Sequence, residues 1–148
     1  MSFFNARLRY ALCAVVDLAL QPPLQSCQSR EIATRQGIPG PYLDQILAAL
    51  KSAGIVRSVR GAGGGYNLSR SPSKITAGEI VKAMMRGDQL FASGEEAILE
   101  SSGAEWVVHE LEERVEQSIC AILESVTLED LAQRKVGLDE NLAIMPSI

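Results

Sequence analysis

The residues that most suggest binding chemistry form a glycine-rich segment with an arginine close on either side. Residues 56–70 read VRSVRGAGGGYNLSR, and glycine-rich loops can hold phosphates through their backbone N–H groups. A P-loop requires GxxxxGK(S/T) before a helix, but no lysine follows these glycines. A dinucleotide fingerprint, GxGxxG, that starts at Gly61 would need a third glycine where Tyr66 stands, and a strand-like run follows instead of a helix. The spacing therefore argues against a nucleotide-binding enzyme.

The remaining reactive side chains do not form a catalytic pattern. The chain has one histidine, His109, and no convincing pair of nucleophile and base, so we expect that it is not an enzyme. Cys13, Cys27 and Cys120 are widely separated and form no CxxC pair, which argues against a disulfide framework or a zinc ribbon. We expect Cys13 in the core, Cys120 buried near a subunit interface, and Cys27 to be the most exposed thiol, because it lies in a polar loop.

Charge divides the chain into two unlike halves. Residues 1–86 contain 11 Lys and Arg against 4 Asp and Glu, a net charge of +7, whereas residues 87–148 contain 3 against 14, a net charge of -11. A basic front half suits a polyanion such as nucleic acid, which would repel the acidic rear half. No apolar run approaches the roughly 18 residues of a membrane span, and Asp17 interrupts the apolar N-terminal stretch. We therefore expect a cytoplasmic protein with no membrane partner.

The front half contains the pattern of a helix-turn-helix unit. Apolar residues with helical periodicity predict a helix over residues 5–20, which Pro22 and Pro23 end. A second helix can start with Ser29 as its N-cap and stop at Gly37. A third has Pro41 in its first turn and ends at residue 54. The apolar positions around Gly37 have the spacing that locks two such helices together; they are Ile32, Ala33, Leu43 and Ile46.

A hairpin follows the third helix directly. Residues 55–60 and 66–69 read as two short strands joined by the glycine loop, and Thr76 can cap a further helix that ends at Gly87. Helix-turn-helix followed by a two-stranded ribbon is the winged-helix architecture, in which the third helix enters the major groove and the ribbon tip reaches a phosphate backbone or the minor groove. Residues 1–87 are thus predicted to be a winged helix-turn-helix domain in a mainly α fold with one small β-hairpin.

The rear half predicts a helix that associates with a second copy. We expect a connecting loop over residues 88–104, a long helix and a short following helix over 105–135, and an irregular tail over 136–148. Apolar residues of the long helix are spaced 3, 4, 4, 3 and 4, which resembles a coiled-coil seam. The predicted seam consists of Val108, Leu111, Val115, Ile119, Ile122 and Val126.

Residues 9–87 resemble the Rrf family of bacterial, IscR-like winged helix-turn-helix transcription regulators. The resemblance is carried by RYAL, by GIPGPYLDQILAALKSAGIVRSVRGAGGGYNL and by ITAGEIV; it covers over half the chain, and the VRGxGGGY wing is highly specific. It implies a homodimer that crosses a long C-terminal helix between subunits and binds double-stranded DNA, with a pseudo-palindromic operator expected from two-fold symmetry.

The resemblance also implies the residues that contact DNA. Pro41, Tyr42, Asp44 and Gln45 occupy positions that face base edges: the Gln45 amide can pair with adenine, and Asp44 could accept from a cytosine amino group. Tyr42 could instead pack where two helices cross. Arg60 lies where the wing enters the minor groove, with the backbone of Gly61, Gly63 and Gly64 close by. The expected phosphate contacts are Arg7, Arg9, Ser29, Lys51 and Arg57.

The chain departs from the pattern of the cluster-binding members. Those members carry three closely spaced cysteines before the long helix, and this chain has none between Cys27 and Cys120. We therefore predict no cysteine-ligated iron-sulfur cluster and no metal site. Two alternatives remain open: a redox- or metal-responsive regulator that uses Cys27, Cys120 or His109, with glutamates 95, 96, 100 and 105 nearby, and a winged-helix protein-interaction module without DNA binding.

Overall fold

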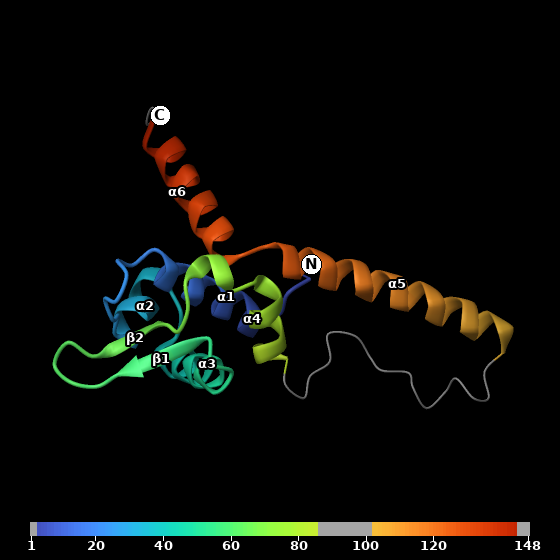
Figure 1. Ribbon diagram of the computed structural model, residues 1–148, viewed down its shortest axis with the longest axis horizontal. Coiled ribbons are helices and arrows are strands. Elements are labelled where there is room, and N and C mark those ends of the chain that lie inside the picture. Colours follow the sequence, from blue (N-terminus) through green and yellow to red (C-terminus); the bar gives the residue numbers. More distant parts are fainter. Residues whose placement is uncertain (1–2, 86–101, 145–148) are drawn as a thin grey trace.

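The computed structural model describes residues 3–85 and 102–144. In it a winged helix-turn-helix body carries a long helix that extends away from it and a last helix that rises at an angle (Figure 1). The elements in chain order are α1 (Ala6–Ala19), α2 (Ser29–Gln36), α3 (Gly40–Ser52), β1 (Val56–Val59), β2 (Gly65–Leu68), the 3-10 helix η1 (Pro72–Lys74), α4 (Ala77–Met84), α5 (Gly103–Ser125) and α6 (Leu128–Ile144). The predicted fold class is confirmed.

The core forms where α1, α2, α3 and α4 pack together. The apolar face of α3, made of Leu43, Ile46, Leu47 and Leu50, is fully buried, and it meets Leu8 and Val15 of α1. Gly37 ends α2 in the left-handed region, at φ 63°, a conformation that glycine adopts without strain. One prediction about a helix start was wrong: Gln28, not Ser29, is the N-cap of α2, and its N–H donates to the Glu31 carboxylate at 3.1 Å.

The wing is an antiparallel hairpin attached to the segment that precedes α2. Val56 pairs with Leu68 and Val59 with Gly65, and the turn closes through a bond from the Gly64 N–H to the Gly61 carbonyl at 2.9 Å. Cys27 then exchanges two backbone hydrogen bonds with Tyr66, at 2.8 and 2.7 Å. The base of the wing is thereby fixed to the start of the helix-turn-helix.

Among the described residues, the long helix α5 contacts the body at its C-terminal end. The Ala77 N–H donates to the Val126 carbonyl at 2.8 Å, and the Leu128 N–H donates to the Ile75 carbonyl at 2.9 Å. Glu124 pairs with Lys82 of α4 at 3.2 Å. None of the 23 residues of α5 is buried in the single subunit. The described residues therefore leave most of this helix uncovered.

The predicted irregular tail over residues 136–148 is wrong as far as Ile144, because α6 continues to that residue. Gly137 looks like a helix end in the sequence, but an internal glycine costs a helix only about 1 kcal/mol. Burial of Leu128 and Ala132 anchors α6 to the body, and Lys135 pairs with Asp139 one turn later, at 2.6 Å. Most of the predicted connecting loop, residues 88–101, lies outside the described residues.

The structure reverses two predictions about cysteines. Cys13 is exposed and Cys27 is buried, because Cys13 lies on the outer face of α1 whereas the wing covers Cys27. Cys120 is exposed in the single subunit, so its predicted burial depends on a second subunit.

Candidate nucleic-acid interface

The helix α3 presents one polar face to solvent. Pro41, Asp44, Gln45 and Lys51 are all exposed, on the side opposite the buried leucines. Asp44 and Gln45 follow Pro41 by three and four residues, and Lys51 follows Asp44 by seven. These spacings place the four residues on one side of a helix. Ala48 is exposed between them; the sequence interpretation missed it, although its i+3 and i+4 spacing from Gln45 and Asp44 could have indicated it. This face has the length and the side chains to read base edges in a major groove.

Tyr42 does not belong fully to that face. Its ring lies edge-on against the ring of Tyr10 in α1, with centroids 5.6 Å apart, and it is half-buried beside the core. This geometry supports the packing alternative for Tyr42 over a base contact.

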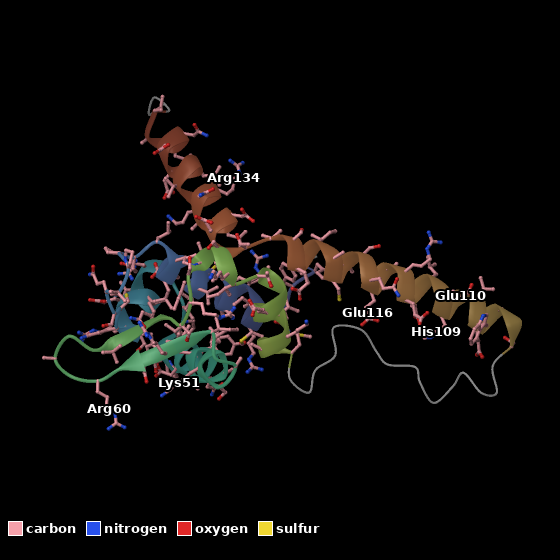
Figure 2. The ribbon with its side chains drawn as sticks, viewed as in Figure 1. Lys51, Arg60, His109, Glu110, Glu116 and Arg134 are labelled. Carbon is pink, nitrogen blue, oxygen red and sulfur yellow. The ribbon has the colours of Figure 1, made fainter. Side chains whose placement is uncertain are left out.

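The wing places Arg60 on the same side of the molecule as α3. Figure 2 shows Arg60 pointing down from the wing and Lys51 on the underside of α3. Arg60 is exposed and makes no hydrogen bond or ion pair within the described parts of the chain. Arg57 differs, because its Nε donates to the Asn67 side chain across the hairpin at 2.8 Å. Arg60 is therefore free to reach a ligand, whereas Arg57 is partly held in place.

The glycines of the wing have different roles. A side chain at Gly61 or Gly63 would meet no atom within 4 Å, although the φ of Gly61, 109°, favours glycine. A β-carbon at Gly64 would collide with the Val59 carbonyl, and one at Gly65 would collide with the Cys27 carbonyl. The glycine run is thus explained by a tight turn and by close packing against the segment before α2.

A shallow cavity of about 430 Å³ lies between the wing and the start of α2. Ser29 and Arg30 line it together with Gly61, Gly64 and Tyr66. Arg30 is exposed and donates to the Gln28 side chain at 3.2 Å. The sequence analysis predicted Ser29 as a phosphate contact and missed Arg30. Arg30 could have been predicted too, because it also lies in the first turn of α2. The other predicted phosphate contacts lie on α1, where Arg7 is half-buried and Arg9 is exposed.

Cys27 lies in a polar cluster beneath the wing. Its thiol donates to the Glu31 carboxylate at 3.3 Å, and Arg35 donates to its sulfur at 2.8 Å. Arg35 also holds the Asp17 carboxylate of α1 with two hydrogen bonds, at 2.9 and 2.8 Å. Burial raises the pKa of the Cys27 thiol above its usual value, and this outweighs the opposing effect of Arg35. Cys27 is therefore a protonated, covered thiol near neutral pH.

The described residues do not fit a metal or a cluster. His109 lies 4.0 Å from Glu112 and 3.5 Å from Glu113, but among the described residues no group of three or more His, Cys, Asp or Glu side chains could hold a metal ion. The three cysteines lie on α1, before α2 and on α5. Glutamates 95, 96 and 100 fall outside the described residues, and residues 86–101 contain no cysteine.

The predicted dimerisation seam forms an exposed apolar stripe along α5. Val108, Leu111, Val115 and Ile122 are between 45 and 63 % exposed, and Trp106 and Val107 add to the stripe at its N-terminal end. Ile119 and Val126 are half-buried, and Val126 is the C-cap of the helix, not part of it. None of the described helices is long and apolar enough to cross a membrane.

Comparisons with known proteins agree with this geometry. The family model "Rrf2: Iron-dependent Transcriptional regulator" matches residues 4–134. A relative described as an HTH-type transcriptional regulator of Synechocystis sp. is 38% identical over 128 residues, 86% of this chain and 85% of the relative. IscR of Xenorhabdus nematophila is 34% identical over 132 residues, 88% of this chain and 79% of the relative.

Solved structures of transcription regulators also resemble this chain. The structure of T. potens IscR matches with a TM-score of 0.73 and 32% identity, over 98% of this chain and 93% of that one. CymR, described as the global cysteine regulator of B. subtilis, also matches with a TM-score of 0.73 and 32% identity, over 90% of this chain and 98% of its own. These matches indicate no enzymatic family.

Proposed function

We propose a mode of action from the premise that this chain belongs to the Rrf2 family and is a DNA-binding transcription regulator. It acts as a cytoplasmic homodimer and is not an enzyme. Each subunit places the exposed face of α3 in a major groove of a pseudo-palindromic operator, with Arg60 of the wing at the adjacent minor groove. Half-sites then lie about 34 Å apart, one turn of the duplex.

One observation carries this proposal: the exposed face of α3 and the unpaired Arg60 lie on the same side of the body (Figure 2). Gln45 and Asp44 offer hydrogen-bonding groups for bases, while Lys51 and Arg60 offer charge for phosphates or a narrow minor groove. The apolar stripe on α5 supports the homodimer, because an exposed stripe of this kind is covered when two such helices pack together.

Site selection from random DNA, followed by titration at several salt concentrations, tests the proposal. We expect enrichment of a two-fold symmetric sequence, and a log affinity that falls linearly with log salt by about 0.9 for each phosphate neutralised. Binding to no sequence above background, with no salt dependence, would support the protein-interaction module instead.

We further propose that regulation does not use a cysteine-ligated cluster of the three-cysteine kind. The support is the separation of the three cysteines on different elements and the cover over Cys27. Iron and sulfide analysis of anaerobically purified protein tests this, and stoichiometric amounts of both would contradict it. A redox or metal response through Cys27, Cys120 or His109 stays a second candidate, and the exposure of the Cys120 thiol in the single subunit is the observation that favours its redox form.

A further inference from the structure

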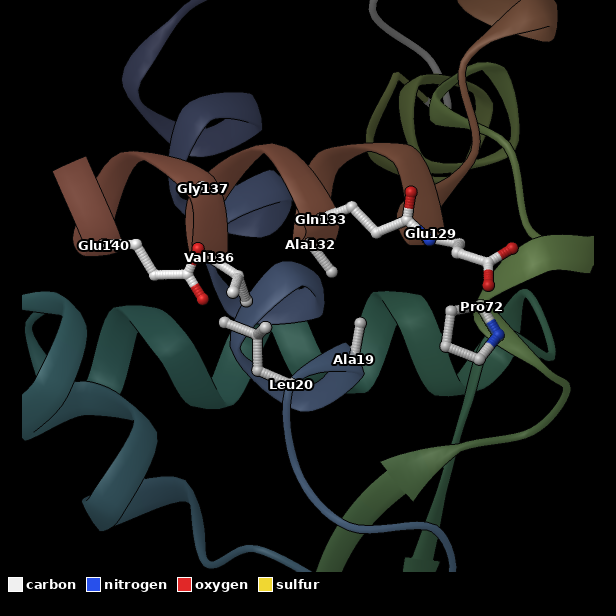
Figure 3. A pocket seen from close by; sticks show the side chains of 9 residues that line it. All are labelled: Ala19, Leu20, Pro72, Glu129, Ala132, Gln133, Val136, Gly137 and Glu140. Carbon is white, nitrogen blue, oxygen red and sulfur yellow. The ribbon is translucent and has the colours of Figure 1, made fainter.

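A groove separate from the DNA-binding face lies between the end of α1 and α6. It has a volume of about 410 Å³, within the range of roughly 300–1,000 Å³ that is typical of small-molecule pockets. Its floor is apolar and consists of Ala19, Leu20, Pro72, Ala132 and Val136 (Figure 3). A ligand in this groove would contact both the helix-turn-helix body and the helix that follows α5.

The polar groups of the groove are arranged along α6. Glu129 and Glu140 stand toward the two ends of the apolar floor in Figure 3, with the Gln133 amide one turn from Glu129. Glu140 follows Glu129 by eleven positions, which corresponds to about 16 Å along a helix, at about 1.5 Å per residue. Among the described residues, no lysine or arginine lines the groove. Neither glutamate has a hydrogen bond or ion pair with the described parts of the chain.

We propose that this groove binds a linear aliphatic polyamine. Its methylene chain lies on the apolar floor, and its terminal ammonium groups pair with the carboxylates of Glu129 and Glu140. The Gln133 carbonyl oxygen can accept a hydrogen bond from an inner ammonium group. Charge complementarity selects this class, because an anionic ligand would be repelled by both carboxylates. A small metal ion could not reach both ends, and it would leave the apolar floor unused.

Isothermal titration of the purified full-length protein with spermidine and spermine, without DNA, tests the proposal. Glu129→Gln with Glu140→Gln should weaken binding by about tenfold or more, because two charge-assisted contacts are lost. The matched control is Glu110→Gln with Glu116→Gln on α5, which removes the same charge far from the groove (Figure 2) and should change the affinity less than about twofold. Val136→Trp, which fills the groove and keeps its charge, should also abolish binding.

Three results would overturn the proposal. One is an equal loss of affinity in the groove variant and the α5 control, which would mean diffuse attraction to an acidic surface. Another is the absence of binding by the parent protein at millimolar polyamine. The third is a change of oligomeric state in the groove variants by light scattering, which would show that a second copy occupies the groove. Operator binding is measured separately, so failure here is distinguishable from failure of the proposed DNA-binding mode.

Discussion

At the scale of single residues, Arg60 is the side chain on which the proposed minor-groove contact depends. Replacing Arg60 with Ala should weaken operator binding by about tenfold and reduce any preference for A·T pairs beside the half-site, because a narrow minor groove attracts arginine. Arg134→Ala is the matched control, since it removes the same charge from α6, away from the wing (Figure 2). Electrophoretic mobility shift with both variants measures the effect, and equal affinities for Arg60→Ala and the parent would remove Arg60 from the interface.

The burial of Cys27 predicts that its thiol reacts slowly. Burial raises the pKa of its thiol, and the thiolate is the reactive species. An alkylating reagent at about pH 8 should therefore modify exposed Cys13 at least tenfold faster than Cys27. Mass spectrometry of partly labelled peptides measures the two rates, and the difference should vanish in denaturant. Faster labelling of Cys27 in the folded protein would contradict its burial.

The same raised pKa of Cys27 makes stability depend on pH. The native state holds the thiol proton more tightly than the unfolded chain, whose thiol has a pKa of 9.0. Cys27 therefore stabilises the fold below that pKa, and this contribution is lost as pH rises through the higher folded value. Between about pH 8 and about pH 10 the free energy of unfolding should fall more steeply for the parent than for Cys27→Ala. Parallel curves from urea titrations would contradict this.

At the scale of elements, the attachment of the wing to the segment before α2 depends on Gly65. Its φ of 151° and the nearby Cys27 carbonyl leave no room for a side chain. Gly65→Ala should lower the free energy of unfolding by about 1–3 kcal/mol and weaken DNA binding. Gly63→Ala, with open space around it, is the control and should change stability by less than about 0.5 kcal/mol. Thermal melts of both variants measure the difference; equal melting temperatures would mean that the wing tolerates the change.

The packing of α2 against α1 depends on a buried carboxylate. Asp17 is 3% exposed, and besides Arg35 it accepts from the Gln36 amide at 2.9 Å. Asp17→Ala should destabilise the fold by about 2–3 kcal/mol, at the lower end for a broken buried pair because the Arg35 side chain is 41% exposed. Asp139→Ala, which breaks the exposed pair with Lys135, should cost less than about 1 kcal/mol. Chemical denaturation measures the free energy of unfolding of both variants. Similar losses of stability would contradict the role of Asp17 in the contact between α1 and α2.

At the scale of the whole molecule, charge and apolar surface are separated along the chain. The basic front half forms the helix-turn-helix body with its wing, and the acidic rear half includes α5, which extends away from that body (Figure 1). In the proposed binding mode, in which α3 and the wing contact the duplex, α5 is thereby kept away from the DNA, so a chain with a pI of about 5.0 can still bind a polyanion.

The exposed apolar stripe on α5 is the proposed homodimer interface, and a charge placed in it should disrupt the dimer. Leu111→Glu places a charge in the proposed dimer interface, and it should produce monomers and weaken operator binding by more than tenfold, because both half-sites are then no longer held together. Gln117→Glu, on a different face of the same helix, introduces the same charge and should leave the dimer intact. Light scattering after size-exclusion chromatography measures the mass, and an unchanged mass for Leu111→Glu would contradict the proposed interface.

The sequence by itself determined the helix-turn-helix, the wing and the apolar stripe of the long helix. These features depend on signals that act within a few residues, such as the left-handed Gly37, Pro41 in a first turn and the three- and four-residue spacing in α5. The face of α3 could be predicted for the same reason: burial of Leu43 and Ile46 on one side leaves Asp44 and Gln45 on the other.

Only the tertiary structure decided that Cys27 is buried, that Asp17 pairs with Arg35, and how long α6 is. Cys27 lies in a polar loop, but Tyr66, far along the chain, covers it. Asp17 interrupts an apolar helix, and only the packing of α2 brings Arg35 to it. Gly137 resembles a helix end, but burial of Leu128 and Ala132 against the body outweighs its low helix propensity. In each case a contact between distant segments contributes more free energy than the local preference, and such contacts cannot be deduced from neighbouring residues alone.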